Sequence, residues 1–181
     1  MKARSTDNTQ IGKKIDLRRQ ATAHLKKTKV LDLFGGENRL WASFELDRYY
    51  GVEKEKGKGR NLTADNMRVI RSLDLSGFNV IDIDTYGIPA NQLSEIFDNP
   101  TLTPGTVIIY TCISNKRSAL SRRIIEMFGL SEMYKKVKVI LNGLGPELFH
   151  AYLYEMGIAE IKRYVVKDGT NYHKEYGSFV V

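Results

Sequence analysis

Residues 30–53 contain the side chains that are best spaced to hold a ligand. An apolar, β-prone run at 30–34 ends at Gly35 and Gly36, where a chain can turn sharply and let a ligand approach the backbone. A second strand is predicted at 49–53, and it ends in Glu53, eighteen residues beyond Gly35. An acid about 20 residues after a glycine turn hydrogen-bonds a ribose in nucleotide-binding α/β folds. The order strand, turn, helix, strand and acid therefore predicts a site for the adenosine half of a cofactor.

The charge at this turn bears on which cofactor it would hold. A dinucleotide places its pyrophosphate at the helix N-terminus, where the dipole favours negative charge. Here Glu37 falls in the first turn of the predicted helix, and Asp32 precedes the glycines. Two carboxylates would repel a pyrophosphate, but they suit a cationic ligand such as S-adenosylmethionine. The alternative is structural: Glu37 favours the first helical turn and Asp32 caps it.

The rest of the chain alternates predicted strands with predicted helices. Strands are predicted at 61–64, 78–84 and 106–114, and helices at 67–73, 90–98, 117–128 and from Pro146 onward. A hairpin is predicted from 160–166 and 176–181. This terminal hairpin distinguishes the pattern from an ordinary dinucleotide fold, whose last strand enters parallel after a helix. The strand at 78–84 carries acids only near its C-terminal end, where ligands bind in open α/β sheets.

Composition and charge limit the class of protein. A chain of 181 residues with 42% hydrophobic content is long enough for one core, and its longest apolar runs are too short to span a bilayer. We expect a soluble, cytoplasmic protein with no membrane partner. Cys112 lies in an apolar run and is predicted to be a buried, inert thiol. The three histidines are dispersed, so no metal site is predicted.

The excess positive charge lies entirely in the first 29 residues. They contain nine Lys or Arg against two Asp, whereas the remainder has nineteen of each sign. We therefore divide the chain into a basic N-terminal extension at 1–28, which could be helical, and a domain at 29–181. Such an extension can follow a nucleic-acid phosphate backbone, and the alternative is a solvated terminus that aids solubility. The cations are Lys13, Lys14, Arg18, Arg19, Lys26, Lys27 and Lys29, with Lys2 and Arg4 before them.

With these residues placed, the chain resembles the class I S-adenosylmethionine-dependent methyltransferases over most of residues 28–181. The resemblance implies a three-layer, Rossmann-like α/β fold: a seven-stranded, mostly parallel sheet with an antiparallel C-terminal hairpin strand. It implies S-adenosylmethionine as the cofactor, with ribose bound by Glu53 and the adenine amino group facing Asp65. The methionine part would lie at Asp32, Phe34, Gly35 and Gly36.

The end of the strand at 78–84 suggests the reaction. Residues 82–89 read Asp-Ile-Asp-Thr-Tyr-Gly-Ile-Pro. This resembles the Asp-x-Asp-Pro-Phe-Gly-Ser-Pro motif of tRNA guanine-N2 dimethyltransferases, and it departs at Thr85 and Ile88. The resemblance implies catalytic roles for Asp84 and Tyr86 in methylating an exocyclic nitrogen of an RNA or DNA base.

The chemistry of such an amine explains why these residue types would be needed. Its lone pair is delocalised into the base, and a carboxylate that accepts its N–H bonds localises that pair toward the methyl group. Tyr86 could stack the base. Residues 82, 84 and 86 share one parity, so they would face the same side of an extended segment, with Asp82 deeper and structural.

Several alternatives remain at this stage. Asp84 could support the cofactor site or cap a turn, and Tyr86 could simply pack. Because Thr85 replaces the usual proline and the glycine turn is short, the chain could be a catalytically silent module that binds nucleic acid or a protein partner. A small-molecule methyltransferase is a further alternative.

Overall fold

The computed structural model describes residues 10–57, 62–115, 119–167 and 172–181. Its strands form one seven-stranded sheet in the order β3-β2-β1-β4-β5-β7-β6. Neighbours from β3 to β5 pair in parallel, whereas β7 is antiparallel to both β5 and β6. The predicted fold class is therefore confirmed. The strands are β1 Lys29–Asp32, β2 Arg48–Glu53, β3 Leu62–Thr63, β4 Val80–Ile83, β5 Val107–Asn115, β6 Lys162–Lys167 and β7 Tyr172–Val180.

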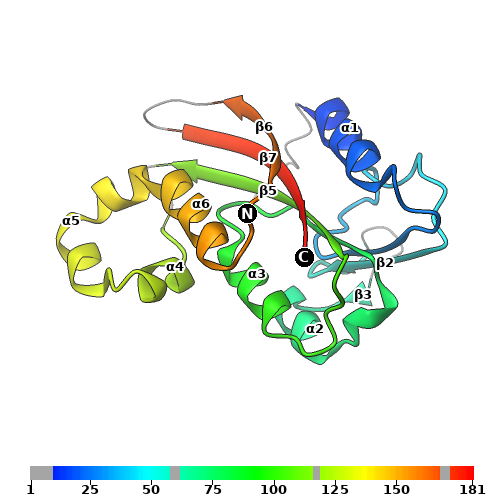
Figure 1. Ribbon diagram of the computed structural model, residues 1–181, viewed down its shortest axis with the longest axis horizontal. Coiled ribbons are helices and arrows are strands. Elements are labelled where there is room, and N and C mark those ends of the chain that lie inside the picture. The colour runs from blue at the N-terminus through cyan, green and yellow to red at the C-terminus, as the bar shows by residue number, and fades with distance from the viewer. Residues whose placement is uncertain (1–9, 58–61, 116–118, 168–171) are drawn as a thin grey trace.

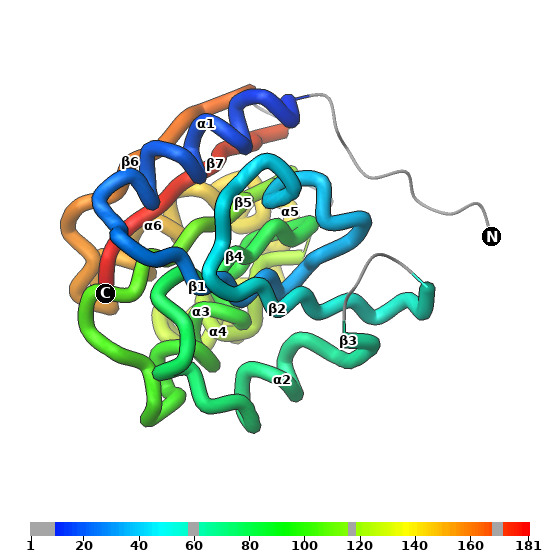
Figure 2. Tube along the Cα trace, turned by 90° about the vertical axis from the view of Figure 1, so that its right-hand side faces the viewer, coloured from blue at the N-terminus to red at the C-terminus, as the bar shows by residue number. Residues whose placement is uncertain are grey.

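Helices cover both sides of this sheet. Figure 1 shows α1 on one side of the strands and α2, α3 and α6 on the other, and in Figure 2 α1 runs along β7. The helices are α1 Ile11–Thr22, α2 Asn66–Ser72, α3 Ala90–Phe97, α4 Arg122–Met127, α5 Ser131–Gly143 and α6 Gly145–Glu155, with a short 3-10 turn at Leu75–Gly77. No helix in the described part of the chain is long and apolar enough to cross a membrane.

Alternation along the central strands separates two cores. Leu31, Ile81 and Ile83 face the side of α3 and α6, where they join a large apolar cluster. Val30 and Val80 face the other side, where Leu17 and Ala21 of α1 and Trp41 cover them. Cys112 belongs to the larger cluster, and burial raises the pKa of its thiol well above the usual value, so the prediction of a buried, inert thiol is confirmed.

The helix predicted after the glycine turn is absent, and that prediction was wrong. Residues 33–47 form a series of turns, in which Asn38 adopts a left-handed backbone conformation with φ of 61°. Such a residue interrupts a helix. Glu37 is therefore not at a helix N-terminus; it is half exposed and ion-paired with Arg39. The argument that Glu37 repels a pyrophosphate from a helix end does not hold.

A second difference lies between β5 and α6. The helix predicted at 117–128 is confined to α4, and its predicted start at 117 lies outside the described residues. The chain then forms α5, which was not predicted. Val137 has non-helical angles inside α5, and Val139 and Ile140 are exposed. The apolar stripe that reveals an amphipathic helix is therefore interrupted.

Candidate functional site

The C-terminal ends of β1 and β4 bring three carboxylates together. The register pairs Asp32 with Asp82, and the Leu33 amide donates to the Asp82 carbonyl at 2.9 Å. Asp84 follows two residues after Asp82, so all three acids project toward the face covered by α1. The prediction that residues 82 and 84 share one side is thus confirmed by their common contacts with α1.

Asp82 is enclosed by contacts within the protein. Arg18 binds it with two hydrogen bonds, Nε to Oδ2 and Nη2 to Oδ1, each at 2.8 Å. The Trp41 indole also donates to Oδ2 at 2.7 Å. The side chains of Arg18 and Asp82 are 2% and 0% exposed. This bidentate pair ties α1 and the 33–47 segment to the end of β4, which is the structural role expected for Asp82.

Asp84 is held by α1 as well. The Lys14 ammonium lies 2.6 Å from both carboxylate oxygens, and the Thr111 hydroxyl donates to Oδ1 at 2.5 Å. The side chain remains 13% exposed. Burial acts to raise the pKa of Asp84, but the charges of Lys14 and Arg18, with the hydrogen bonds from Lys14 and Thr111, bring the pKa below its usual value. Asp84 is therefore ionised at neutral pH.

Asp32 lies in the same buried network. Its oxygens accept from the Phe34 amide at 3.1 Å and from the Tyr49 hydroxyl at 2.9 Å. Burial and the nearby charge of Asp82 raise the pKa of Asp32 to about 7, against the attraction of Arg18. Asp32 is almost fully buried, so its carboxylate takes part in this network rather than lining an open surface.

Three of the predicted cofactor residues share one pocket. Phe34, Glu53 and Asp65 line a cavity of about 150 Å³ at the ends of β1 and β2, together with Leu33, Lys54, Ala64 and Asn66. Glu53 accepts from the amides of Gly36 at 3.2 Å and Lys54 at 2.8 Å. Asp65 caps α2 by accepting from the Arg68 amide at 3.2 Å. Two strands and one helix therefore converge on this pocket.

The glycine turn and the loop after β4 flank these acids. Gly36 has φ of 50°, a conformation that favours glycine, and the Gly35 amide bonds the Val52 carbonyl at 3.0 Å. The turn is thereby fixed to β2. After β4, Tyr86 is 59% exposed, and the Gly87 carbonyl accepts from the Ile113 amide at 2.9 Å. Tyr86 thus stands at the surface of a loop that is tied to β5.

Three residues of the acidic network were not predicted as part of it: Lys14, Arg18 and Thr111. Lys14 and Arg18 were interpreted as cations of a nucleic-acid-binding extension, yet both bond acids of β4. A signal existed in the sequence, since the two cations are spaced i, i+4, and Leu17 and Ala21, each three residues after one of them, have the same spacing. Helix periodicity alone could not identify Asp82 and Asp84 as their partners.

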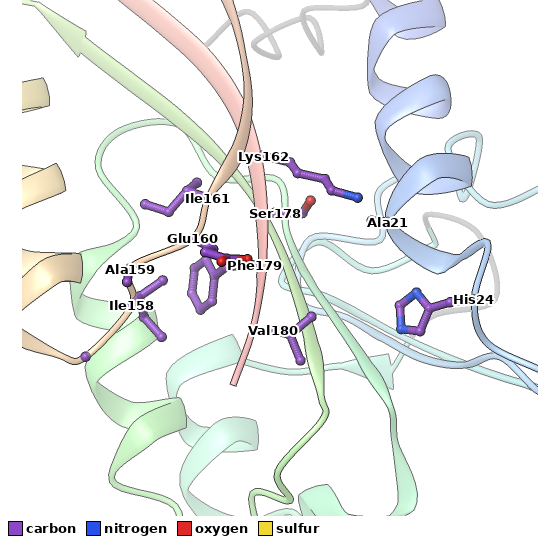
Figure 3. A pocket seen from close by; sticks show the side chains of 11 residues that line it. Ala21, His24, Ile158, Ala159, Glu160, Ile161, Lys162, Ser178, Phe179 and Val180 are labelled. Carbon is purple, nitrogen blue, oxygen red and sulfur yellow. The ribbon is translucent and has the colours of Figure 1, made fainter.

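A larger cavity, of about 560 Å³, lies at the opposite edge of the sheet. Figure 3 shows His24 at the right of it, Lys162 above, and Phe179 and Val180 to the left of His24. Lys162 begins β6 and Val180 ends the antiparallel β7. The cavity is therefore at the N-terminal ends of the parallel strands, away from the acids, whereas ligands in such sheets bind at the C-terminal ends.

No protein-family model matches the chain, and no curated protein sequence is significantly similar to it. Its fold is similar to solved methyltransferases. N-methyltransferase NodS from Bradyrhizobium japonicum WM9 has a TM-score of 0.58 and 13% identity, over 96% of this chain and 97% of that chain. An S-adenosylmethionine-dependent methyltransferase from Archaeoglobus fulgidus has a TM-score of 0.56 and 14% identity, over 93% and 92%.

A third similar structure contains the cofactor. It is phosphoethanolamine N-methyltransferase 2 from Haemonchus contortus in complex with S-adenosyl-L-methionine, with a TM-score of 0.55 and 13% identity. The match covers 93% of this chain and 52% of that one, so this chain spans about half its length. Together these comparisons show that the chain has the Rossmann-like fold of S-adenosylmethionine-dependent methyltransferases. At these identities they define the fold alone.

Proposed function

We propose that this protein is an S-adenosylmethionine-dependent methyltransferase that acts on an exocyclic nitrogen of a nucleic-acid base. One observation carries the proposal: an ionised, partly exposed Asp84 lies at the end of β4, while Phe34, Glu53 and Asp65 line a pocket at the adjacent strand ends. The strand-four motif adds support, because Asp84, Tyr86, Gly87 and Pro89 agree with the guanine-N2 dimethyltransferase pattern.

The pocket residues fit the adenosine part of this cofactor. Among the described residues, Glu53 accepts three amide N–H bonds, from Gly36, Lys54 and Glu55. A carboxylate offers about four acceptor positions, so one remains for a ribose hydroxyl. Asp65 caps α2 through Oδ1, and its other oxygen could accept from the adenine amino group. Phe34 offers an apolar wall.

The transfer depends on how the acceptor amine is held. When bound, S-adenosylmethionine supplies a methyl group on sulfonium, and a nitrogen–carbon bond forms as the carbon–sulfur bond breaks with its electron pair staying on sulfur. Asp84 accepts an N–H of the amine and directs its lone pair toward the methyl carbon. Since the pKa of Asp84 is lowered, it is a weak base, and the amine proton is lost to solvent. Positioning therefore supplies most of the rate.

The same edge of the sheet supports a polyanionic, base-containing acceptor. The exposed Lys167 of β6 lies over the half-buried Tyr172 ring at 5.3 Å. A cation beside an aromatic ring suits a phosphate and a stacked base, whereas Lys14, Lys174 and Tyr176 are buried. The printed names of NodS and of the Haemonchus contortus enzyme, both N-methyltransferases, agree with nitrogen as the acceptor atom.

The test is titration calorimetry with S-adenosylmethionine, followed by transfer of tritiated methyl to mixed RNA and DNA. We expect cofactor binding and label in nucleic acid. Asp84→Ala should abolish transfer and keep cofactor binding, while Asp98→Ala, at an exposed acid after α3, serves as the matched control. Absence of cofactor binding would overturn the whole proposal.

One observation favours a second candidate, a catalytically silent module that binds nucleic acid or a protein partner. Lys14 and Thr111 already fill three acceptor positions of Asp84. In that case nucleic acid would be retained equally by the wild type and by Asp84→Ala, and no label would be transferred to either.

The small-molecule alternative predicts a different salt response. Such an enzyme would enclose its acceptor in an apolar pocket, and its KM would not depend on polyanion binding. A KM for oligonucleotide that rises with salt supports the nucleic-acid proposal, and efficient methylation of small amines alone would favour the alternative.

A further inference from the structure

The contact between Lys14 and Asp84 places a protein amine where the proposed reaction needs an acceptor amine. Lys14 Nζ lies 2.6 Å from Oδ1 and from Oδ2, and Thr111 bonds Oδ1. Oδ1 therefore accepts two hydrogen bonds and Oδ2 accepts one. Since a carboxylate has about two acceptor positions on each oxygen, one position on Oδ2 remains for an N–H from a substrate.

Lys14 is held firmly in this place. Its backbone carbonyl accepts from Arg18 Nη1 at 2.9 Å, and Arg18 is bound in turn by Asp82. Leu17, three residues after Lys14, is buried in the core beneath α1. The ammonium also lies over the Tyr176 ring at 5.4 Å. The backbone of α1 at Lys14 is therefore anchored in the core, and the ammonium is held by Asp84 and by the Tyr176 ring.

Charge in this cluster is balanced before any substrate arrives. Asp84 is opposed by Lys14 and Asp82 by Arg18, while Asp32 adds a third carboxyl, with its pKa raised to about 7, and Lys174 adds a third cation over the Tyr176 ring. An isolated Asp84 carboxylate would attract protonated amines. With Lys14 in contact, a second cation at Oδ2 would face a like charge within a few ångströms in a partly buried site, where screening is weak.

We propose that Lys14 is a specificity-determining and positioning residue, which orients Asp84 and makes the site select a neutral amine carried by an anionic substrate. This inference rests on the proposed function and deepens it, because it names the charge state of the acceptor. An exocyclic base amine is neutral at pH 7 and is flanked by phosphates. A protonated alkylamine is cationic, and it must also lose a proton before it can attack.

Substitution of Lys14 tests this selection. Lys14→Met keeps most of the length of the side chain and removes its charge, Lys14→Arg keeps the charge, and Lys136→Met is the control at an exposed lysine of α5. The measured quantity is the ratio of kcat/KM for an oligonucleotide to kcat/KM for spermidine, with tritiated methyl as the label. We expect Lys14→Met to shift this ratio toward spermidine by about tenfold or more, mainly through KM.

The other variants should leave the ratio close to that of the wild type. Lys14→Arg retains the fixed cation, so it should preserve the preference even if kcat falls, and Lys136→Met should match the wild type in both substrates. An unchanged ratio in Lys14→Met would overturn the inference while the methyltransferase proposal stands. No transfer to either substrate by the wild type would instead remove the proposed function and, with it, this inference.

A measurement on the wild type alone covers the case in which Lys14→Met does not fold. Salt screens attraction and repulsion alike. Between about 50 and 200 mM salt, the KM for spermidine should fall because its repulsion weakens, and the KM for oligonucleotide should rise because counterion release is suppressed. If both KM values rise together, cationic amines are not repelled and the inference is wrong.

Discussion

The two faces of the sheet are built on different principles. On the side of α3 and α6, Ile81 and Ile83 of β4 are fully buried in an apolar cluster. On the side of α1, the alternate residues are Val80, Asp82 and Asp84, and the acids are neutralised by α1. The segment formed by β4 and Asp84 therefore has one face that only packs and one face that ends in charge.

The two faces are therefore stabilised in different ways, one by apolar packing and the other by a buried charge network. An apolar face gains stability from each buried side chain independently. A buried charge network gains little by itself, but the loss of one member leaves an uncompensated charge. We therefore expect substitutions on the two faces to differ in whether a second substitution can compensate for the first.

The largest effect is expected from Arg18→Met. It leaves Asp82 buried without its cation, and the free energy of unfolding should fall by about 4 kcal/mol, as measured by urea denaturation. The double variant Arg18→Met, Asp82→Asn removes both charges and keeps an acceptor for Trp41, so it should recover most of the loss. A double variant that is no more stable than Arg18→Met would contradict the charge-network interpretation.

Ile81→Ala on the apolar face should cost about 3 kcal/mol, because it removes a fully buried side chain and leaves a cavity. Denaturation of Ile140→Ala provides the control, since Ile140 is an exposed residue of α5 and its loss should change stability by less than about 0.5 kcal/mol. Equal losses at the two isoleucines would mean that this face is not close-packed.

A smaller effect concerns pH. The pKa of Asp32 is raised from its ordinary value of 3.8 to about 7, so between those pH values the folded state binds a proton that the unfolded state has released. Stability should therefore fall as the pH rises through this window. Asp32→Asn should flatten the profile by on the order of 2 kcal/mol, measured by denaturation at several pH values. Parallel profiles for wild type and variant would contradict the raised pKa.

The smallest effect is expected outside both faces. Glu37 lies in the 33–47 turns and pairs with Arg39 at the surface. Glu37→Gln should change stability by less than about 0.5 kcal/mol. Its affinity for S-adenosylmethionine in calorimetry should equal that of the wild type, because no helix N-terminus places this carboxylate against a ligand. A marked loss of affinity for S-adenosylmethionine would mean that Glu37 takes part in cofactor binding.

Much of the fold could be predicted because periodicity reports which residues are buried. The runs around Val80 and Ile108 are short, apolar and β-prone, and both became strands in the centre of the sheet. The helix after the glycine turn was mispredicted because it was inferred from the nucleotide-binding layout of strand, turn, helix and strand, whereas the segment forms turns and Trp41 bonds Asp82. A tertiary hydrogen bond has no periodicity to detect.

The candidate site likewise contains residues that could be assigned from the sequence and residues that could not. Glu53 could be assigned to a ligand site from its spacing after the glycine turn, and the resemblance to methyltransferases added Phe34 and Asp65, which line the same pocket. Lys14 could not be assigned to Asp84, since the two residues are seventy positions apart and their pairing depends on how α1 lies across the sheet.

The sequence by itself determined four local features: the glycine turn, the acids at strand ends, the shared parity of Asp82 and Asp84, and the terminal hairpin. These features depend on local backbone geometry and on the alternation of side chains along a strand, and both follow from the residue types and their spacing. Only the tertiary structure decided that Lys14 and Arg18 of the basic N-terminal extension point into the protein and bond Asp84 and Asp82. The reason is physical: burying Asp82 and Asp84 required cations, and α1 was the element that could bring them there.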